Sequence, residues 1–163
     1  TDPQYINDAM RRGTMDEPRA RDKYGERYAP VTETGFMVRD DWGFQIGFSP
    51  DGLVGDEGLI EAKSRRPKKH LQTILANEVP AANMAQIQCG LLVSGRDWCD
   101  YLSFCGGMPL YVKRVLPDKR WHDAIIAAVT TFEETAAVMT ALYQDATKGL
   151  AQTERTYYEE MSL

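Results

Sequence analysis

The stretch that most constrains how this chain can fold runs from Ser49 to Lys63 and reads SPDGLVGDEGLIEAK. Asp51 follows a proline and precedes a short apolar run, and after a glycine-containing turn a second apolar run carries Glu61 and Lys63. Side chains two residues apart on a β-strand point to the same face of a sheet. We therefore predict that Glu61 and Lys63 share one face, and that their apolar neighbours point into the opposite layer.

The same stretch predicts a β-hairpin, because two apolar runs flank residues that favour a turn. A regular four-residue turn would set Asp51 opposite Ala62, one residue away from the register in which Asp51 and Glu61 face the same point. A β-bulge would correct that register, and glycine is a residue that bulges commonly use. We therefore predict a bulge or a strong twist near Gly55 or Gly58.

Apolar periodicity and capping residues predict the remaining elements. Helices are expected over residues 4–28, 67–77, 80–94 and 118–148, and further strands over residues 31–39, 42–49, 98–104 and 109–116. Pro18 leaves open whether one helix starts near Asp16 or two helical segments meet there. The order of elements indicates one α/β domain over residues 1–150, with a central mixed sheet flanked by helices on both sides. A polar tail follows over residues 151–163, which is either disordered or docked on a neighbour.

The last predicted helix carries an apolar stripe whose members recur at alternating spacings of four and three residues. They are Ile125, Val129, Phe132, Ala136, Met139 and Tyr143. A stripe of this kind is far more often core than a cofactor site, so we expect these side chains to pack inside the domain.

Charge and composition disfavour several classes of protein. The net charge of −5 argues against a protein that coats nucleic acid with its whole surface, although a local basic site stays compatible. No segment approaches the roughly 20 apolar residues of a membrane span, and no signal peptide is evident.

The chain begins with Thr1 rather than Met, which leaves open a missing upstream helical part. The cysteines (Cys89, Cys99 and Cys105) lack a CxxC spacing, so we expect reduced thiols in a cytosolic protein rather than a disulfide framework or a zinc site.

The acids and the lysine of the hairpin match the needs of phosphodiester hydrolysis. Carboxylate oxygens are ligands that Mg²⁺ prefers, and we expect Asp51 and Glu61 to bind one or two such ions together with the backbone carbonyl of Ala62. Lys63 is then placed to hold a water molecule or to stabilise the charge that develops at the phosphorus. The alternative is an exposed ion pair beside an ordinary Pro-Asp-Gly turn, and the apolar residues before Glu61 favour the site over it.

The densest positive run in the chain begins two residues after Lys63 and includes Arg65, Arg66, Lys68 and Lys69. A run of this kind is usually a solvated loop. Its position beside the predicted carboxylates makes binding of DNA phosphates an equally good interpretation.

Two polar side chains on predicted helices stay open to interpretation from the residues alone. Gln86 is either an ordinary polar flank of its helix or a group aimed at the carboxylates, and helical periodicity is compatible with both. Glu17 is typical of a surface acid in the first turn of a helix, where the helix dipole favours a negative charge.

The motifs of this chain resemble those of the PD-(D/E)xK nuclease superfamily, and more closely those of the phage lambda exonuclease family, also called YqaJ-type viral recombinase nucleases. The chain has Pro50-Asp51 and, ten residues later, Glu61-Ala62-Lys63. It also has a Ser-Pro-Asp-Gly-Leu segment at residues 49–53, a Met-Ala-Gln-x-Gln segment at residues 84–88 and a Gly-x-x-x-Glu pattern that ends at Glu17. The resemblance covers roughly residues 10–145, and four motifs in this order are more specific than any one of them.

The resemblance implies a restriction-endonuclease-like core and a Mg²⁺-dependent exonuclease, with Mn²⁺ as a substitute ion. It implies 5′→3′ degradation of one strand of linear double-stranded DNA from 5′-phosphorylated ends, in phage-type recombination beside a single-strand annealing protein. It also implies a homotrimeric ring in the cytoplasm of a bacterial host, encoded by a phage or prophage, with no membrane partner. Carried over residue by residue, Asp51 and Glu61 look like metal ligands, and Lys63 looks like the catalytic lysine. Glu17 and Gln86 look like helix residues of the catalytic site.

The phosphate pocket of that family matches this sequence only in part. The family holds the 5′-phosphate with a basic residue after the catalytic strand, and Lys68 or Lys69 lies nearest to that position. The family's upstream helix, which adds an arginine and a hydroxyl group, has no counterpart in this sequence. Two other functions therefore stay open: a structure- or site-specific endonuclease on the same scaffold, and a non-catalytic module that binds DNA ends. The intact Asp51, Glu61 and Lys63 disfavour the non-catalytic module.

Overall fold

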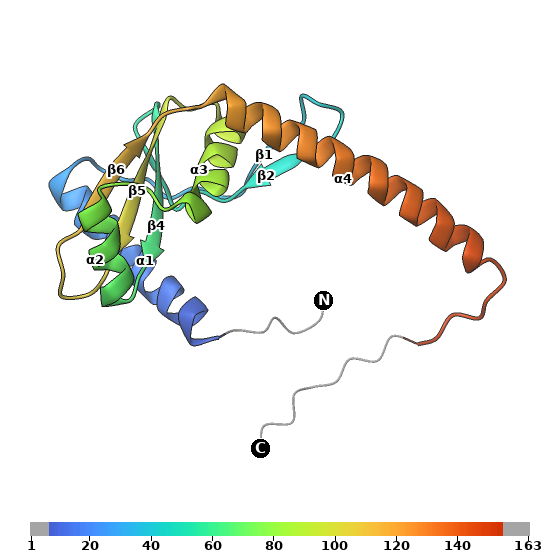
Figure 1. The fold of residues 1–163 in the computed structure, drawn as a ribbon, viewed down its shortest axis with the longest axis horizontal. Helices are drawn as coiled ribbons and strands as arrows, with labels where there is room; N and C mark the ends of the chain where they lie inside the picture. The colour runs from blue at the N-terminus through green and yellow to red at the C-terminus, as the bar shows by residue number, and fades with distance from the viewer. Residues whose placement is uncertain (1–6, 155–163) are drawn as a thin grey trace, which may run out of the picture.

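The structure is a computed structural model and describes residues 7–154. In chain order these contain α1 (Asp8–Arg27), β1 (Met37–Arg39), β2 (Ile46–Phe48), β3 (Gly52–Val54), β4 (Gly58–Ser64), α2 (Pro67–Ala76), α3 (Ala81–Ser94), β5 (Trp98–Phe104), β6 (Tyr111–Val115) and α4 (Lys119–Ala146). α4 extends away from the body that the other elements form (Figure 1). Of the predicted tail, residues 151–154 have no regular secondary structure, and the rest lies outside the described residues.

The central sheet has four strands in the order β3-β4-β5-β6. β4 and β5 run parallel, whereas β3 pairs with β4 and β6 pairs with β5 in antiparallel fashion. Two parallel neighbours need a crossover connection, and the segment that contains α2 and α3 provides it. β1 and β2 form a separate antiparallel pair. The α/β fold with a central mixed sheet, which the sequence predicts, is confirmed.

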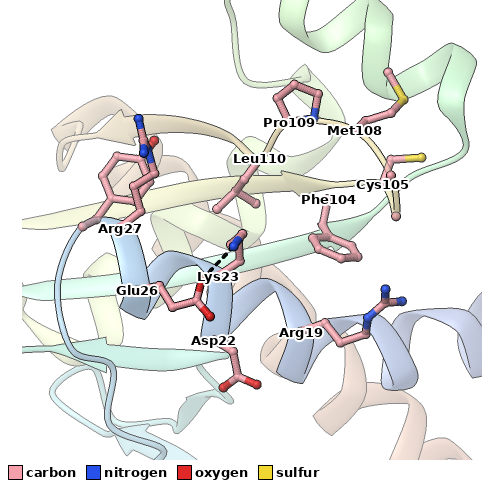
Figure 2. Close-up of a pocket in the computed structure, with 13 residues that line it drawn as sticks. Arg19, Asp22, Lys23, Glu26, Arg27, Phe104, Cys105, Met108, Pro109 and Leu110 are labelled. Atoms are coloured by element: carbon pink, nitrogen blue, oxygen red, sulfur yellow. Dashed lines mark hydrogen bonds and ion pairs between the residues drawn. The ribbon is translucent and has the colours of Figure 1, made fainter.

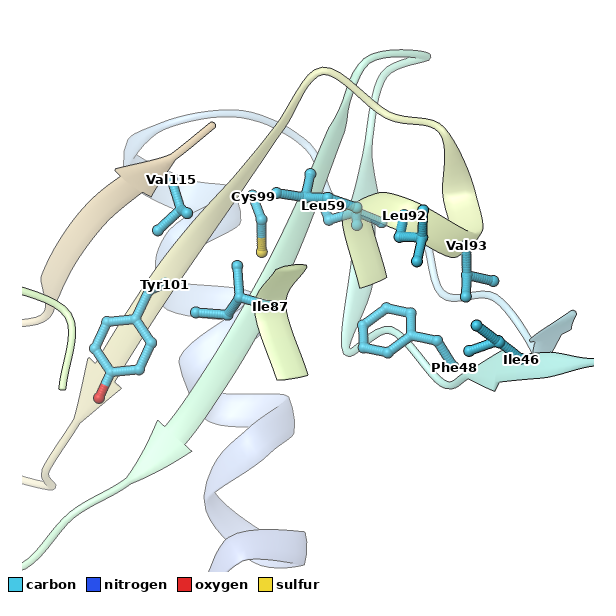
Figure 3. Packing of buried hydrophobic residues seen from close by; sticks show 10 residues of the cluster. Ile46, Phe48, Leu59, Ile87, Leu92, Val93, Cys99, Tyr101 and Val115 are labelled. Atoms are coloured by element: carbon cyan, nitrogen blue, oxygen red, sulfur yellow. The ribbon is translucent and has the colours of Figure 1, made fainter. Parts of the chain in front are cut away.

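Alternation along the strands gives the sheet two apolar faces. On one face, Leu59 and Tyr101 pack with Ile87 of α3 (Figure 3). On the other face, Ile60 packs with Tyr24 of α1. β4, which carries the predicted site residues, therefore lies between helices and is held from both sides.

α1 is one continuous helix, which settles the alternative that Pro18 left open. The Asn7 side chain caps it by accepting a hydrogen bond from the Met10 N–H at 2.9 Å. Pro18 lies inside the helix and lacks the N–H that would bond to the preceding turn. The helix continues because Ala20 and Tyr24 are buried against the rest of the domain, so packing outweighs the local cost of the proline.

The strands predicted over residues 31–39 and 42–49 are much shorter in the structure. β1 and β2 contain three residues each, and Thr32 forms only an isolated bridge with Leu53. Among the described residues β1 and β2 pair only with each other, outside the central sheet. The predicted strands are too long because few backbone groups of this segment have a neighbouring strand with which to form hydrogen bonds.

The hairpin of β3 and β4 does not contain the regular four-residue turn that would set Asp51 opposite Ala62. Gly52 pairs with Ile60, and the turn contains three residues. Gly55 opens the turn at φ +54°, in the left-handed region that glycine adopts without strain. This register, continued by one residue, sets Asp51 opposite Glu61. The irregularity expected at the turn glycines therefore takes the form of a shorter turn rather than a bulge.

The apolar stripe of α4, predicted to be core, is largely exposed. None of the residues of α4 is buried. Near its start, Ile125 and Val129 pack against the core cluster to which α3 contributes. Farther along, Phe132, Met139 and Tyr143 are 67%, 64% and 70% exposed. The prediction is wrong because α4 runs beyond the sheet and α3, where no described residue covers it (Figure 1).

Within residues 7–154, α4 is long and apolar enough, by length and composition alone, to cross a membrane. Its most apolar window has a mean hydropathy of 1.4. The expectation that no segment comes near a membrane span is therefore wrong for this helix. Glu133 and Glu134 interrupt the apolar run in the sequence, but the average over the window stays high.

The three cysteines are free, as predicted, and none forms a disulfide. Cys99 and Cys105 are buried, and Cys89 is half-buried. Burial raises the pKa of Cys89 and that of Cys99, so both side chains stay protonated thiols at neutral pH.

Candidate active site

A cavity of about 260 Å³ opens at the edge of β4, beyond the point where pairing with β3 ends. Its walls come from α1, β4, α3 and the turn before β3. They include all five side chains that the sequence analysis assigned to a catalytic site, namely Glu17, Asp51, Glu61, Lys63 and Gln86. The structure therefore brings these predicted residues together at one place.

Glu61 is the most enclosed of these groups, because its side chain is completely buried. The Lys63 ammonium lies 2.5 Å from its Oε1 and forms an ion pair with it. Apart from this ion pair, neither Glu61 oxygen has a hydrogen-bond partner among the described residues. Burial first, and repulsion from Asp51 second, raise the pKa of Glu61 to about 7, although Lys63 acts in the opposite direction. Lys63 itself donates a hydrogen bond to Gln86 Oε1 at 2.9 Å.

Asp51 is held against the open edge of β4. Its Oδ2 accepts a hydrogen bond from the Ala62 N–H at 2.6 Å. The N–H and C=O of one strand residue point to the same side, so the carbonyl of Ala62 also faces this edge. Burial raises the pKa of Asp51, although the Ala62 N–H and the nearby Lys63 and Arg21 charges lower it.

Glu17 approaches the same point from α1 and is less enclosed, with 39% of its side chain exposed. Burial first, and repulsion from Asp51 second, raise its pKa. Glu17, Asp51 and Glu61 therefore all have raised pKa values, and two of them are raised partly by the charge of Asp51. Carboxylates that disfavour one another's charge in this way form a site that a cation would stabilise.

The residues present fit a hard divalent cation. No group of three or more His, Cys, Asp and Glu side chains within residues 7–154 is close enough to hold a metal by itself. Asp51 and Glu61 offer carboxylate oxygens and Ala62 offers a backbone carbonyl, a donor set that suits an ion which keeps several of its waters. The Glu61 oxygens, buried with no polar partner among the described residues except the Lys63 ammonium, are the groups that such an ion would satisfy.

Sequence reasoning missed Arg21, which ties α1 to the turn that carries Asp51. Arg21 Nη1 donates a hydrogen bond to the Asp51 backbone carbonyl at 2.8 Å. The same nitrogen lies 3.8 Å from Glu17 Oε1, and Nη2 lies 3.3 Å from Glu33 Oε1. Only 14% of the Arg21 side chain is exposed. The available signal was its spacing, because Arg21 follows Glu17 by four residues and so shares its helix face.

Asp16 and Ser64 form a second missed pair on the wall of the cavity. The Ser64 hydroxyl donates to Asp16 Oδ2 at 2.7 Å, and Arg12 Nε donates to the Ser64 oxygen at 3.0 Å. Asp16 also accepts a hydrogen bond from Arg19 Nη1 at 3.0 Å on Oδ1. Ser64 directly follows Lys63, but one serine after a strand carries no distinctive signal in the sequence.

The basic run after β4 does not line this cavity, contrary to its predicted place beside the carboxylates. Arg65 Nη2 instead donates to Asn83 Oδ1 at 2.5 Å. Arg66, Lys68 and Lys69 are exposed at the start of α2. The run departs from the site because Pro67 begins a helix there, which carries these side chains away from the edge of β4.

A family model described as the YqaJ-like viral recombinase domain matches residues 1–97 of the chain. Among solved structures, the crystal structure of LHK-Exo in complex with dAMP is similar over 91% of this chain and 78% of that chain, with 32% identity and a TM-score of 0.82. A second crystal structure, of an alkaline exonuclease (LHK-Exo) from Laribacter hongkongensis, is similar over 89% of this chain and 77% of that chain, with 35% identity and a TM-score of 0.74.

A more distant likeness concerns the fold alone. The crystal structure of SSO0001 has 15% identity over 78% of this chain and 61% of that chain, with a TM-score of 0.54. A search of curated proteins gave no significant match.

Proposed function

Because this chain belongs to the family of YqaJ-like viral recombinase domains, we propose that it is a Mg²⁺-dependent 5′→3′ exonuclease that degrades one strand of linear double-stranded DNA from its ends. The similarity to an alkaline exonuclease supports an exonuclease, and the resemblance to the lambda exonuclease family supports the polarity. The observation that carries the proposal is the fully buried Glu61 carboxylate, which has no polar partner among the described residues except the Lys63 ammonium, while Asp51 lines the same cavity.

Two of the acids that line the cavity and one backbone carbonyl are assigned to the metal. Asp51, Glu61 and the carbonyl of Ala62 would hold Mg²⁺, or Mn²⁺ in its place. A bound divalent cation neutralises charge on the scissile phosphate and lowers the pKa of a bound water. The Ala62 N–H keeps Asp51 Oδ2 oriented toward the edge of β4, which prepares the carboxylate for that role.

The remaining site residues are assigned to the phosphate and the attacking water. Lys63 places its ammonium in the cavity, where it can donate to a phosphate oxygen as negative charge develops. Gln86 accepts a hydrogen bond from that ammonium and so holds it in position. Glu17, with its raised pKa and its partial exposure, is suited to accept a proton from water on a carboxylate oxygen.

Outside the cavity, exposed cations are assigned to the DNA backbone. Arg66, Lys68 and Lys69 lie together at the start of α2, and Arg65 precedes them. Lysine and arginine bind phosphates without reading sequence, which suits an enzyme that degrades any DNA end. We assign them to the incoming DNA rather than to the reacting phosphate, because the cavity itself does not include them.

The assembly that we propose is a homotrimeric ring threaded by DNA, working beside a single-strand annealing protein in the cytoplasm of a bacterial host. The exposed apolar stripe of α4, which includes Phe132, Met139 and Tyr143, supports self-association because no described residue of the chain covers it. The net charge of −5 also fits a ring whose acidic exterior discourages DNA from binding anywhere except the hole.

A digestion assay tests this function. Linear duplex DNA with 5′-phosphate or 5′-hydroxyl ends is incubated with Mg²⁺ and either the wild-type protein or the Lys63→Ala variant. We expect mononucleotides from the linear duplex, a preference for the 5′-phosphate, and at least a hundredfold loss of rate in the variant. Lys119→Ala, which removes an exposed lysine from α4, is the matched control and should keep the wild-type rate.

Three results would change the assignment. Products from closed circular DNA would favour an endonuclease. A 5′-phosphorylated linear duplex left intact by the wild-type protein would favour a DNA-end-binding module without catalysis. Equal rates for wild type and Lys63→Ala would refute the role given to Lys63.

A further inference from the structure

A second cavity lies along the exposed second half of α1 (Figure 2). Its volume is about 820 Å³, against about 260 Å³ for the candidate active site. One wall is the second half of α1, and the other is the loop between β5 and β6, from Cys105 to Leu110. We call this cavity the α1 groove.

A single layer of side chains separates the α1 groove from the candidate active site. Asp16 lines the active-site cavity and accepts a hydrogen bond from Ser64 on Oδ2. Its other oxygen accepts a hydrogen bond at 3.0 Å from Arg19, which lines the α1 groove. Phe104, also in the groove, pairs with Ser64 where the parallel strands β4 and β5 end. The two cavities are therefore neighbours at Asp16, Ser64 and Phe104.

Cations follow one another along the helical wall of the groove. Arg19, Lys23 and Arg27 are spaced by four residues, which corresponds to a rise of about 6 Å along an α-helix. Asp22 and Glu26 also line the groove, so the lining keeps one net positive charge. Glu26 pairs with Lys23 at 2.7 Å, whereas Arg27 forms no ion pair within residues 7–154. Arg19 also pairs with Asp16 at 3.0 Å, so among the described residues the wall offers one unpaired cation at Arg27 and two cations that a phosphate would share with their carboxylate partners.

An aromatic ring and bare backbone complete the groove at the end nearest the active site. The Arg19 guanidinium carbon lies 5.4 Å from the centroid of the Phe104 ring. The backbone of Gly106 lies close to the same guanidinium, where a Cβ added to Gly106 would be 3.8 Å from Arg19 Nη2. Gly107 has a φ of +81°, in the left-handed region, where the loop turns. Aromatic rings beside cations are the combination on which single-stranded nucleic acid binds, with bases stacked on the rings and phosphates on the cations.

We propose that the α1 groove binds a short single-stranded segment of DNA, with its phosphates on Arg19, Lys23 and Arg27 and a base against Phe104. This inference rests on the proposed function, which makes single strands from duplex DNA. A single strand fits better than a duplex, because Phe104 can stack only on a base whose face is free of a neighbouring base pair. The net positive lining disfavours a basic peptide and leaves an acidic peptide as the competing occupant.

Equilibrium binding of a fluorescent short oligothymidylate tests the proposal. Anisotropy is measured with a chelator, which prevents hydrolysis, at several salt concentrations. The Lys23→Ala/Arg27→Ala double variant should bind about tenfold more weakly. The slope of log affinity against log salt should fall by about 1.4, since each phosphate of a single strand contributes about 0.7. Phe104→Leu should also weaken binding about tenfold, but with the slope unchanged, because base stacking releases no counterions.

The matched control removes the same charge from another part of the chain. Lys119→Ala/Lys148→Ala changes two exposed lysines, one in the first turn of α4 and one in the turn that follows α4, and should alter affinity less than twofold. Wild-type affinity in the groove variants would overturn the proposal. Competition by thymidine monophosphate as strong as that by the oligonucleotide would also overturn it, in favour of a product site. The proposal would also be overturned if the double variant lost the ability to bind polyglutamate but still bound oligothymidylate.

The cleavage assay separates failure of this inference from failure of the proposed function. If the wild-type protein degrades linear duplex DNA while the groove variants bind oligothymidylate as tightly as the wild type, the groove assignment is refuted and the exonuclease function is supported. If the wild-type protein cleaves no DNA while the groove variants bind oligothymidylate more weakly than the wild type, the proposed exonuclease function is refuted and the groove assignment is supported. Thermal unfolding of each variant shows whether it is folded, and the exposure of Lys23 and Arg27 favours an unchanged melting temperature.

Discussion

At the scale of single residues, the burial of Glu61 disfavours the charged form of its carboxyl group. Its pKa is raised from an ordinary value near 4.5 to about 7. Between these two pH values the folded protein keeps a proton on Glu61 that the unfolded chain has already lost. The metal-free protein should therefore lose stability as pH rises from about 4.5 to about 7. The expected loss in the free energy of unfolding is about 3 kcal/mol, at 1.36 kcal/mol per pKa unit.

Urea unfolding in the presence of a chelator, measured from pH 4.5 to 8, checks this pH dependence. Glu61→Gln keeps the shape of the side chain and cannot ionise, so its stability should fall less than that of the wild type over that range, and the remaining fall belongs to Asp51 and Glu17, whose pKa values are also raised. Mg²⁺ should stabilise the wild-type protein more at pH 8 than at pH 5, because proton and metal compete for the same carboxylates. Parallel curves for the wild type and Glu61→Gln would contradict the assignment of the raised pKa.

Arg21 is a positioning residue, since it contacts the backbone of Asp51 and approaches Glu17 without lining the cavity itself. We expect Arg21→Gln to lower both the Mg²⁺ affinity and kcat by about ten- to a hundredfold, as for other residues that orient metal ligands. Arg21→Lys should recover part of the Mg²⁺ affinity, because an ammonium can still donate to the Asp51 carbonyl. Isothermal titration with Mg²⁺ measures this directly.

The partner of Arg21 at the surface offers a control for that experiment. Glu33 is 76% exposed and lies 3.3 Å from Arg21 Nη2. Because exposed ion pairs contribute little, Glu33→Gln should leave the Mg²⁺ affinity within about twofold of the wild type. If Arg21→Gln and Glu33→Gln gave the same small change, Arg21 would have only a structural role.

The sequence predicted which residues meet in the cavity because their motifs are local or are carried on regular elements. Glu61 and Lys63 share a strand face by simple alternation, and that geometry needs no tertiary information. Glu17 and Gln86 were placed by resemblance, since helical periodicity alone left both open. Arg21 was missed because its target is a backbone carbonyl, and a carbonyl gives no signal in the residue pattern.

At the scale of the elements, α3 fits against the hairpin of β1 and β2 through a glycine. A Cβ added at Gly90 would lie 2.6 Å from the Phe48 ring, which is buried in the same core. Gly90→Ala should therefore destabilise the protein by about 2 kcal/mol, because overpacking forces a buried ring out of place. Urea unfolding measures the change.

A second helical glycine serves as the control for α3. Gly25 lies in α1, where an added Cβ meets nothing within 4 Å. Gly25→Ala should stabilise the protein by about 0.5–1 kcal/mol, since alanine favours a helix more than glycine does. Equal destabilisation by both substitutions would show that the contact with Phe48 is not the cause.

The bounds of the helices were predicted more closely than those of the strands, because a helix forms its hydrogen bonds within its own segment, whereas a strand forms them with another segment of the chain. The caps at Asp118 and Gly95 mark helix ends within a few residues of sequence, and both appear in the structure. A strand ends where its neighbour ends, so the lengths of β1 and β2 depend on pairing that the sequence does not display. The turn at Gly55 illustrates the same limit, because a change of one residue in its length decides which side chain faces Glu61.

At the scale of the whole molecule, the apolar stripe of α4 was predicted to be buried and is largely exposed in the structure. Periodicity shows that a helix has an apolar face, but not whether that face is covered by its own chain. The first turns of α4 pack on the domain through Ile125 and Val129. The later apolar residues are exposed, and that contrast within one helix favours an interface between copies over a core position.

Self-association through α4 can be separated from membrane binding by two measurements on one pair of variants. Light scattering after size exclusion should give about three times the 18.4 kDa monomer mass for the wild type. Met139→Glu/Tyr143→Glu should reduce the mass to that of the monomer, because each charged side chain replaces an apolar group whose burial contributes about 1.5–3 kcal/mol. Both side chains are exposed in the single chain, so the far-UV circular dichroism and the melting temperature of the domain should change little.

A matched variant on the same helix completes the experiment. Thr140→Glu/Gln144→Glu adds the same two charges, at the same four-residue spacing, to exposed polar positions of α4 and should stay trimeric. Flotation with anionic lipid vesicles tests the other use of an apolar helix, and we expect the wild-type protein to stay in the unbound fraction. A wild-type monomer that floats with vesicles would overturn the ring. A trimeric mass for Met139→Glu/Tyr143→Glu would place the interface elsewhere, because two buried glutamates without partners would cost more than an association through this face could tolerate.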